Sequence, residues 1–296
     1  MFPIDDPTAA TTLPTPEAAG TPGFWTEGNP TLGVPATRVR ASFLNMLMQE
    51  LLNILVAAGI TPSKTTYNQI AQAIPILTPG RQIGHRVFTS STTYTPTPGT
   101  AFVEIEVVGA GAAGGGVPTT TAGQVAVGAG GTSGARAIGR FAVAAVTGQT
   151  ITVGAAGVGA LNATGGNGGA SSVGSLIVAN GGTGGSAGTA SGSSIALGNT
   201  TQAAATGGNI FNETGRIARL AVVVFGSLAY GGDGGDSAHG AGGSGFASPL
   251  GTLSGNGLAA TGYGAGGGGA LATTSNASTR SGGNASPGVV VIKEFA

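Results

Sequence analysis

The sequence predicts a mainly β protein in which a small N-terminal helical hairpin precedes a β-sandwich with glycine-rich, polyglycine-II-like loops. Apolar residues recur every third or fourth position from 43 to 58, which indicates a helix. Beyond residue 84 this period disappears, and short alternating or β-branched runs indicate strands. Glycine supplies 59 of the 296 residues, and all but eight of them follow residue 100. The change in composition places a boundary near residue 83.

Residues 1–36 predict an extended N-terminal arm, because they are rich in proline, threonine, alanine and glycine and show no periodicity. The first six residues are acidic and interrupted by proline, whereas a secretion signal begins with basic residues followed by an apolar stretch. We therefore expect no signal peptide. We also expect no membrane insertion, because the most apolar helical stretch is shorter than the roughly 20 residues that a bilayer requires.

Residues 37–83 predict a helical hairpin. One face of its first helix carries an apolar row with i, i+4 spacing, formed by Phe43, Leu47, Leu51 and Leu55. Gly59 is suited to end this helix, Thr61 and Pro62 to begin a second one, and Pro75 to end that. So broad an apolar face packs either against the arm or the next domain, or against copies of the chain. Because the first helix is apolar over most of its circumference, we favour an oligomer interface at this row.

Residues 84–296 predict a β-sandwich in which strands distant in sequence pair with one another. The clearest strand is 100–109, where successive side chains alternate between two faces. Runs of β-branched residues predict further strands at 149–153, 173–179, 216–225 and 288–295, with weaker candidates at 86–89 and 136–143.

Glycine triplets of the form Gly-Gly-X occur in pairs at 165–170, 181–186 and 231–236. Their period matches an extended left-handed helix with three residues per turn, which has no internal hydrogen bonds. The backbone groups of such a helix must bind neighbouring segments, which approach closely only where side chains are absent. The alternative is a flexible linker. Because the triplets are interleaved with apolar strands and recur through the whole region, we favour ordered packing.

Charge and cysteine content exclude several classes of protein. Charged residues make up 7% of the chain, against about 25% in average proteins. Eleven basic and eleven acidic residues give no net charge, so the chain lacks the basic face that neutralises nucleic-acid phosphates. The absence of cysteine excludes disulfides and thiolate metal sites.

Two glycine motifs match known binding sequences only in part. Residues 109–114 spell G-x-G-x-x-G, but neither a helix nor an acidic residue about twenty positions later follows, as a dinucleotide fold requires. Residues 231–239 approach the calcium-binding nonapeptide, but Ala238 replaces its large apolar residue. That repeat works in stacked arrays, and this one stands alone. Neither motif predicts a ligand.

A carboxylate pair for glycoside hydrolysis is the remaining catalytic possibility, because that chemistry needs two acids flanking the bond. The acidic residues available are Glu104, Glu106, Glu213, Asp233, Asp236 and Glu294. Glu104 and Glu106 share a strand face, which is usually solvated, and no serine, histidine and acid arrangement stands out. We therefore predict that the protein is not an enzyme and holds no cofactor or metal.

The remaining candidates are binding residues. Aromatic and polar side chains on well-held loops suit the recognition of sugars or protein surfaces. The candidates set among the glycines are Tyr230, Asp233, Asp236, His239, Phe246 and Tyr263. For Phe246 and Tyr263 the alternative is packing on the sandwich, and for the two aspartates it is an exposed loop without a role in binding.

Both parts of the chain resemble phage, prophage or tailocin tail-fibre proteins. The N-terminal resemblance lies in G-F-W-T-E-G-N-P at 23–30, G-V-P-A-T at 33–37, F-L-N at 43–45, Q-E-L-L-N at 49–53, A-A-G-I-T-P-S-K at 57–64, N-Q-I at 68–70 and A-I at 73–74. The second part is similar to the glycine-rich tip domain at the C-terminus of such fibres, through residues 103–111, 151–155, 165–172 and 287–295.

This resemblance implies a homotrimer in the virion, joined by its N-terminal arm to a tail or baseplate protein. Its tip loops would bind a receptor on the bacterial surface, such as a polysaccharide, a pilus or an outer-membrane protein. Arg40 departs from the small hydroxyl cap that is frequent in the family, and segments 189–205 and 216–225 look like individual elaborations. The alternatives are a structural tail or capsid-decoration protein without a receptor, and a polysaccharide depolymerase.

Overall fold

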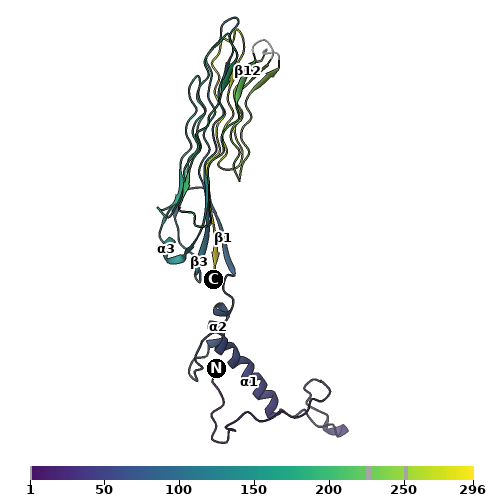
Figure 1. The fold of residues 1–296 in the computed structure, drawn as a ribbon. Helices are drawn as coiled ribbons and strands as arrows, with labels where there is room; N and C mark the ends of the chain where they lie inside the picture. Colours follow the sequence, from purple (N-terminus) through teal and green to yellow (C-terminus); the bar gives the residue numbers. More distant parts are fainter. Residues whose placement is uncertain (1, 225–227, 250–252) are drawn as a thin grey trace. The chain divides into compact units, whose positions relative to one another are not determined.

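The computed structural model describes residues 2–224, 228–249 and 253–296. The chain divides into two compact units, Met1–Arg81 and Gln82–Ala296 (Figure 1). The last position of the predicted strand 216–225 lies outside the described residues, as do positions 250–252.

The first unit contains the 3₁₀ helix η1 (Pro30–Leu32) and two α-helices, α1 (Ala41–Ala57) and α2 (Gln69–Leu77). The side-chain oxygen of Asn29 accepts hydrogen bonds from two backbone N–H groups at the start of η1. α1 begins after Arg40, which makes no side-chain cap. α1 packs against α2, and Leu55 of the first helix and Ala73 of the second are completely buried.

The second helix begins later than predicted, at Gln69 rather than Pro62. The Gln69 side chain holds the intervening residues in a loop. Its carbonyl oxygen accepts from the N–H of Ser63 (3.0 Å), and its amide donates to the carbonyl of Thr61 (2.7 Å). These bonds fix the backbone of 61–63 outside the helix, so Thr61 does not cap it.

The second helix also ends later than predicted, because Pro75 lies inside it rather than at its end. A proline removes one N–H donor, and in so short a helix a single hydrogen bond is lost. The helix continues to Leu77. Beyond it, the N–H and the hydroxyl of Thr78 both donate to the carbonyl of Ile74, at 3.1 and 2.9 Å.

Two five-stranded antiparallel sheets lie at one end of the second unit, called the sheet end here (Figure 1). The first has the order β1 (Gln82–Phe88), β16 (Val289–Phe295), β3 (Phe102–Val108), β5 (Arg136–Ala142) and β11 (Phe211–Glu213). The second has the order β10 (Ala205–Thr206), β8 (Ile177–Ala179), β7 (Ser171–Val173), β6 (Thr150–Thr152) and β2 (Thr92–Thr93). The predicted mainly β architecture is confirmed.

The two five-stranded sheets share one apolar core. Val103, Ile105 and Val107, alternate residues of β3, are completely buried in it, as predicted for this strand. Ile151 of β6 and Ile177 of β8 enter the same core from the second sheet. A short helix that was not predicted, α3 (Val143–Val146), adds one further buried valine.

Two predicted strands are shorter in the structure. The predicted strand 173–179 is a hairpin of β7 and β8, because Gly174 adopts a left-handed φ of 51° and turns the chain. Of the described positions 216–224 in the second predicted strand, those in β12 (Ala221–Val224) form a strand. Before β12, the N–H of Arg219 donates instead to the carbonyl of Asp233 in a glycine segment (2.9 Å).

Smaller sheets lie at the opposite end of the second unit, called the loop end (Figure 1). One has the order β14 (Ala247–Pro249), β13 (Leu228–Tyr230), β12 and β9 (Ile195–Leu197), and the other pairs β15 (Leu271–Ala272) with β4 (Ala126–Val127). A second apolar cluster, which includes Val127, Val223 and Leu271, lies between them. The loops 118–125, 158–164, 189–194 and 273–281 connect the chain at this end.

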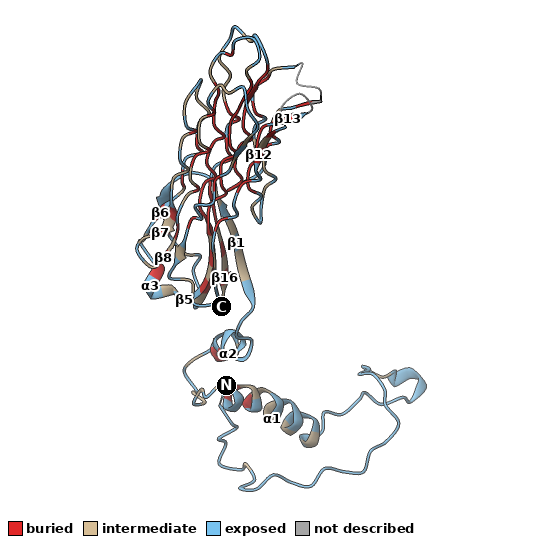
Figure 2. Cartoon of the chain, turned by 45° about the horizontal axis from the view of Figure 1, so that its top comes forward, coloured by how far each residue is buried: buried red, intermediate tan, exposed pale blue. Residues whose placement is uncertain are grey.

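Glycine-rich segments join the two ends and are bonded to one another through their backbones. Segment 109–117 is buried along its whole length, and Figure 2 shows buried residues in red through this region. Its nine N–H groups donate in turn to three neighbouring segments. The N–H groups of 109, 112 and 115 donate to the carbonyls of 135, 132 and 129 in the first segment, and those of 110, 113 and 116 donate to the carbonyls of 169, 166 and 163 in the second. Those of 111, 114 and 117 donate to the carbonyls of 286, 283 and 280 in the third. The hydrogen bonding therefore repeats every three residues.

Close backbone approach explains why glycine occupies many of these positions. A Cβ atom at Gly111 would overlap the carbonyl of Ala265, and one at Gly114 would overlap the carbonyl of Gly268. Neither glycine has a left-handed φ, so conformational freedom is not what requires glycine here. The missing side chain lets adjacent segments come within hydrogen-bonding distance.

Candidate functional site

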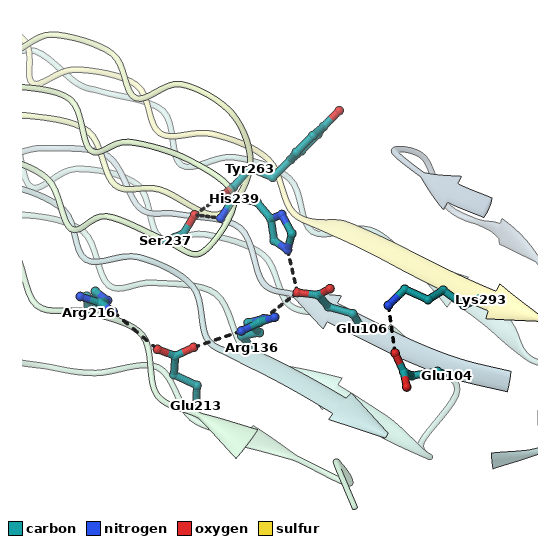
Figure 3. A network of polar contacts seen from close by, with 9 residues as sticks. All are labelled: Glu104, Glu106, Arg136, Glu213, Arg216, Ser237, His239, Tyr263 and Lys293. Atoms are coloured by element: carbon teal, nitrogen blue, oxygen red, sulfur yellow. Dashed lines mark hydrogen bonds and ion pairs between the residues drawn. The ribbon is translucent and has the colours of Figure 1, made fainter. Parts of the chain in front are cut away.

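The six predicted binding residues do not form one site. Tyr230 ends β13 at the loop end, and Asp233 and Asp236 follow it in segment 231–236. His239 and Tyr263 lie in turns whose backbones pair with each other beside the first sheet (Figure 3). The sixth, Phe246, packs against an apolar cluster.

Asp233 and Asp236 bind neighbouring backbone rather than projecting freely. A carboxylate oxygen of Asp233 accepts from the N–H of Gly245, and one of Asp236 accepts from the N–H of Gly242, both at 2.8 Å. Asp233 also lies 3.9 Å from the guanidinium of Arg219. The two aspartates thus join segments 231–236 and 241–246, so part of their hydrogen-bonding capacity is used within the chain.

Phe246 fills space inside the second unit. Its half-buried ring packs against the second apolar cluster, and a Cβ atom at Gly255 would overlap the ring. Packing, the alternative that the sequence left open, is the arrangement found for this residue.

His239 and Glu106 belong to a network of ion pairs at the sheet end (Figure 3). Nε2 of His239 and Nε of Arg136 both lie 2.6 Å from Oε1 of Glu106. Glu213 extends the network, because its carboxylate lies 3.8 Å from Arg136 and 3.9 Å from Arg216. The network connects β3, β5 and β11 with the turn at His239, whose backbone carbonyl also accepts from the N–H of Tyr263.

This network holds a charged carboxylate in place. Burial raises the pKa of Glu106, but hydrogen bonds from His239 and Arg136 outweigh burial and leave the pKa below its usual range. A carboxylate that stays ionised near neutral pH cannot serve as a general acid there. The network therefore holds the turn at His239 against the sheet. The residues of the network come from segments that lie far apart in the sequence, so no sequence motif connects them.

An exposed apolar face accompanies Tyr230 at the loop end. Ala221, Val223 and Ala229 point into the second cluster, so the alternate residues of the strands face outward. These outward residues, here named the strand patch, are Val222, Val224, Leu228 and Tyr230. The register places Val222 opposite Tyr230 and Val224 opposite Leu228, which leaves 43% of Leu228 and 38% of Tyr230 exposed.

Sequence reasoning identified Tyr230 but missed the rest of the strand patch. The run Ala-Val-Val-Val at 221–224 has no polar alternation that would separate an outer face from an inner one. Only the pairing of β12 with β13 shows which of its valines lie beside the tyrosine.

The predicted oligomer residues differ in exposure. Phe43 and Leu47 are 41% and 48% exposed, and the ring of Trp25 meets that of Phe43 edge-on at 5.3 Å. Leu51 is half-buried. Leu55 is completely buried within its own chain, so its side chain is not available to another copy.

Within residues 2–224, 228–249 and 253–296, no group of three or more histidine, aspartate or glutamate side chains is placed to hold a metal ion. No helix in the described part of the chain is both long and apolar enough to cross a membrane.

The two antiparallel sheets and the bonded glycine segments together define a glycine-rich β domain. The chain belongs to the family described as "Glycine-rich domain", whose profile matches residues 87–294. A comparison with curated proteins gives no match.

Proposed function

We propose that this protein is the receptor-binding tip adhesin of a phage, prophage or tailocin tail fibre. It would bind a polysaccharide, pilus or outer-membrane protein on the bacterial surface without catalysis. Support comes from the N-terminal resemblance at residues 23–74 and from the glycine-rich domain that follows it. On this proposal the protein is located in the virion and its N-terminal arm binds a tail or baseplate protein.

In this proposal the glycine segments form a lattice of polyglycine-II-like helices that holds the loops. A helix with three residues per turn directs successive N–H groups about 120° apart, toward three different neighbours. The donors of segment 109–117 follow that rotation three times. At about 3.1 Å per residue, nine residues would hold the loops roughly 28 Å from the sheets. Because backbone hydrogen bonds hold this lattice together, the side chains of the loops would need little reorganisation when they bind a receptor.

The observation that carries the proposal is the strand patch at the same end as the loops. Contiguous exposed apolar residues on a soluble protein mark interaction sites. Tyrosine suits such a site, because its ring gives apolar contact and its hydroxyl forms hydrogen bonds. The neighbouring loops 118–125 and 273–281 supply hydroxyl and amide groups.

The exposed side chains of α1 would join three copies of the chain. Phe43 and Leu47 offer the apolar area, with Trp25 beside them. Three tips on one fibre would bind together, so that weak single sites give tight attachment.

Binding of the labelled full-length protein to a panel of bacterial strains that includes the native host tests this function. We expect saturable binding to some strains, and at least a tenfold loss of affinity in Tyr230→Ala. Tyr67→Ala is the matched control, because Tyr67 is 96% exposed in the first unit, and its binding should equal that of the parent protein. Failure of the parent to bind its native host would favour a structural tail protein. Release of reducing ends from surface polysaccharide would instead show a depolymerase.

A further inference from the structure

The loop end carries a single charged side chain. Residues 117–127, 157–165, 188–198 and 271–282 contain one ionisable group, that of Arg280. The other arginines and lysine described in the second unit have a partner within the chain: Arg86 with Glu294, Arg136 with Glu106, Arg216 with Glu213, Arg219 with Asp233, Lys293 with Glu104, and Arg140 over the ring of Phe102. Among the described residues of this unit, Arg280 is the cation that has neither a carboxylate nor an aromatic ring as its partner.

The backbone of Arg280 is fixed while its guanidinium lacks an anion. Its N–H and carbonyl both bond to Val117, at 3.0 and 2.9 Å. Among the residues that the structure describes, its side chain makes one long hydrogen bond, from Nη2 to Oδ1 of Asn276 at 3.4 Å. Nε is buried, with no acceptor among the described residues. Residues 225–227 and 250–252 contain no acidic side chain either.

Arg280 as a whole is half-buried, but its buried Nε has lost its hydration and gained no acceptor, which is unfavourable. The carboxylate or phosphate of a ligand would give the half-buried guanidinium the anionic partner that it lacks within the chain. Arginine suits such a ligand, because its planar donors match the two oxygens of either group.

Backbone strain is concentrated in the same loops. Of the non-glycine residues that the structure describes, Asn162 and Ser275 alone have a positive φ, of 47° and 57°. The N–H of Asn162 faces the carbonyl of Arg280 at 3.4 Å, and Ser275 lies five positions before Arg280. Such conformations persist where their surroundings fix them, and they cluster at binding sites.

Hydrogen bonds hold these strained loops together. The N–H of Thr120 donates to the carbonyl of Asn276 (3.0 Å), and the N–H of Asn276 donates to the hydroxyl of Thr120 (3.1 Å). The N–H of Ser275 donates to the carbonyl of Thr121 (3.1 Å). The segment around Arg280 is therefore ordered before any ligand binds.

We propose that Arg280 binds the anionic group of an acidic surface saccharide. Exposed hydroxyl and amide side chains around it, including Thr121, Asn162 and Ser278, would bind the sugar hydroxyls. The inference rests on the proposed function, since it names the class of receptor for the loop end. A carboxylate and a phosphate share the chemistry that Arg280 recognises.

Titration of the full-length protein with three oligosaccharides tests this proposal. The probes are an oligogalacturonate, a phosphorylated mannose oligomer and a neutral dextran oligomer of similar length. We expect one or both acidic probes to bind and to shift the Nε–Hε resonance of Arg280 in ¹H–¹⁵N spectra. Which of them binds identifies carboxylate or phosphate. Equal binding of the neutral oligomer, or no binding of either acid, would overturn the proposal.

Variants locate the site. Arg280→Gln should weaken acidic-probe binding about ten- to hundredfold, and Arg280→Lys should weaken it less, because lysine keeps the charge. Arg219→Gln is the control, because Arg219 is 82% exposed and should leave binding unchanged. Thermal unfolding of Arg280→Lys at the same temperature as the parent protein would show that this variant is folded. If the parent and Arg280→Gln bind host cells equally well, this inference fails while the proposed function stands. If the parent binds no cells, the proposed function fails.

Discussion

The hydroxyl of Tyr94 donates a 2.7 Å hydrogen bond to Oε1 of Glu294, although two hundred residues separate them, and both side chains are completely buried. Thr97 donates its hydroxyl to Oε2 at 2.5 Å and its N–H to Oε1 at 3.3 Å. The guanidinium of Arg86 lies 3.7 Å away. In the sequence, Glu294 is one of the acidic residues available for catalysis. In the structure, its hydrogen bonds connect the last strand, β16, to the loop before β3.

Replacing Tyr94 by phenylalanine should destabilise the second unit. Glu294 would remain buried and charged with one donor fewer, and a hydrogen bond to a charged group contributes about 2 kcal/mol. We expect the free energy of unfolding, measured by chemical denaturation, to fall by roughly that amount. Tyr67→Phe removes an equivalent hydroxyl from an exposed residue and should change nothing. Equal stability of the two variants would show that the buried hydrogen bond contributes little.

Stability should decline in acid. Burial raises the pKa of Glu294, but hydrogen bonds from Thr97 and Tyr94 and the charge of Arg86 bring it below its ordinary 4.5; the pKa of Glu106 is lowered as well. Below pH 4.5 the unfolded chain therefore binds more protons than the folded one, and the free energy of unfolding falls as pH falls. Denaturation at pH steps from 3 to 6 should show this decline. It should be shallower in Glu106→Gln, and an unchanged slope would contradict the assignment.

Stability should also decline in strong alkali. Burial, together with the hydrogen bond to Glu294, raises the pKa of Tyr94 above its ordinary 10.0. Above pH 10 the unfolded chain would lose this proton first, so the free energy of unfolding should fall as pH rises further. Tyr94→Phe should remove this part of the alkaline decline, which the same denaturation measurements from pH 9 to 11 would detect.

A side chain inside the glycine segments should be poorly tolerated. In Gly114→Ala the new Cβ would overlap the carbonyl of Gly268, and backbone cannot move aside as a flexible side chain can. We expect a loss of about 3 kcal/mol in the free energy of unfolding. Gly192→Ala is the matched control, because its Cβ would meet one carbonyl at an ordinary 3.4 Å. If both variants unfold alike, the glycines are not required for close approach.

The sequence predicted those features that depend on local repetition. The alternation in β3 and the i, i+4 row of α1 each arise from neighbouring residues, so the chain itself displays them. The start of α2 could not be predicted, because the side chain of Gln69 overrides the favourable cap at Thr61 through two hydrogen bonds to the loop.

The candidate site was predictable only in part for the same reason. Tyr230 could be chosen as a scarce aromatic residue, whereas its neighbour Leu228 depends on the register of β12 and β13. The contact of His239 with Glu106 spans 133 positions, and no motif connects them. The isolation of Arg280 is visible in the sequence as a lack of nearby charge, but its buried Nε is not.

The apolar face of α1 predicts the oligomeric state. A trimer has a mass of about 84 kDa, three times the 28.0 kDa of the chain, which light scattering after size-exclusion chromatography measures directly. Leu47→Arg would place a charge in an apolar interface, where burying it without a partner costs several kcal/mol, so we expect a monomer. Asn53→Arg adds the same charge at an exposed polar position of α1 and should leave the trimer intact. A monomeric parent protein would rule out the trimer, whereas a trimeric Leu47→Arg would place the interface away from this face of α1.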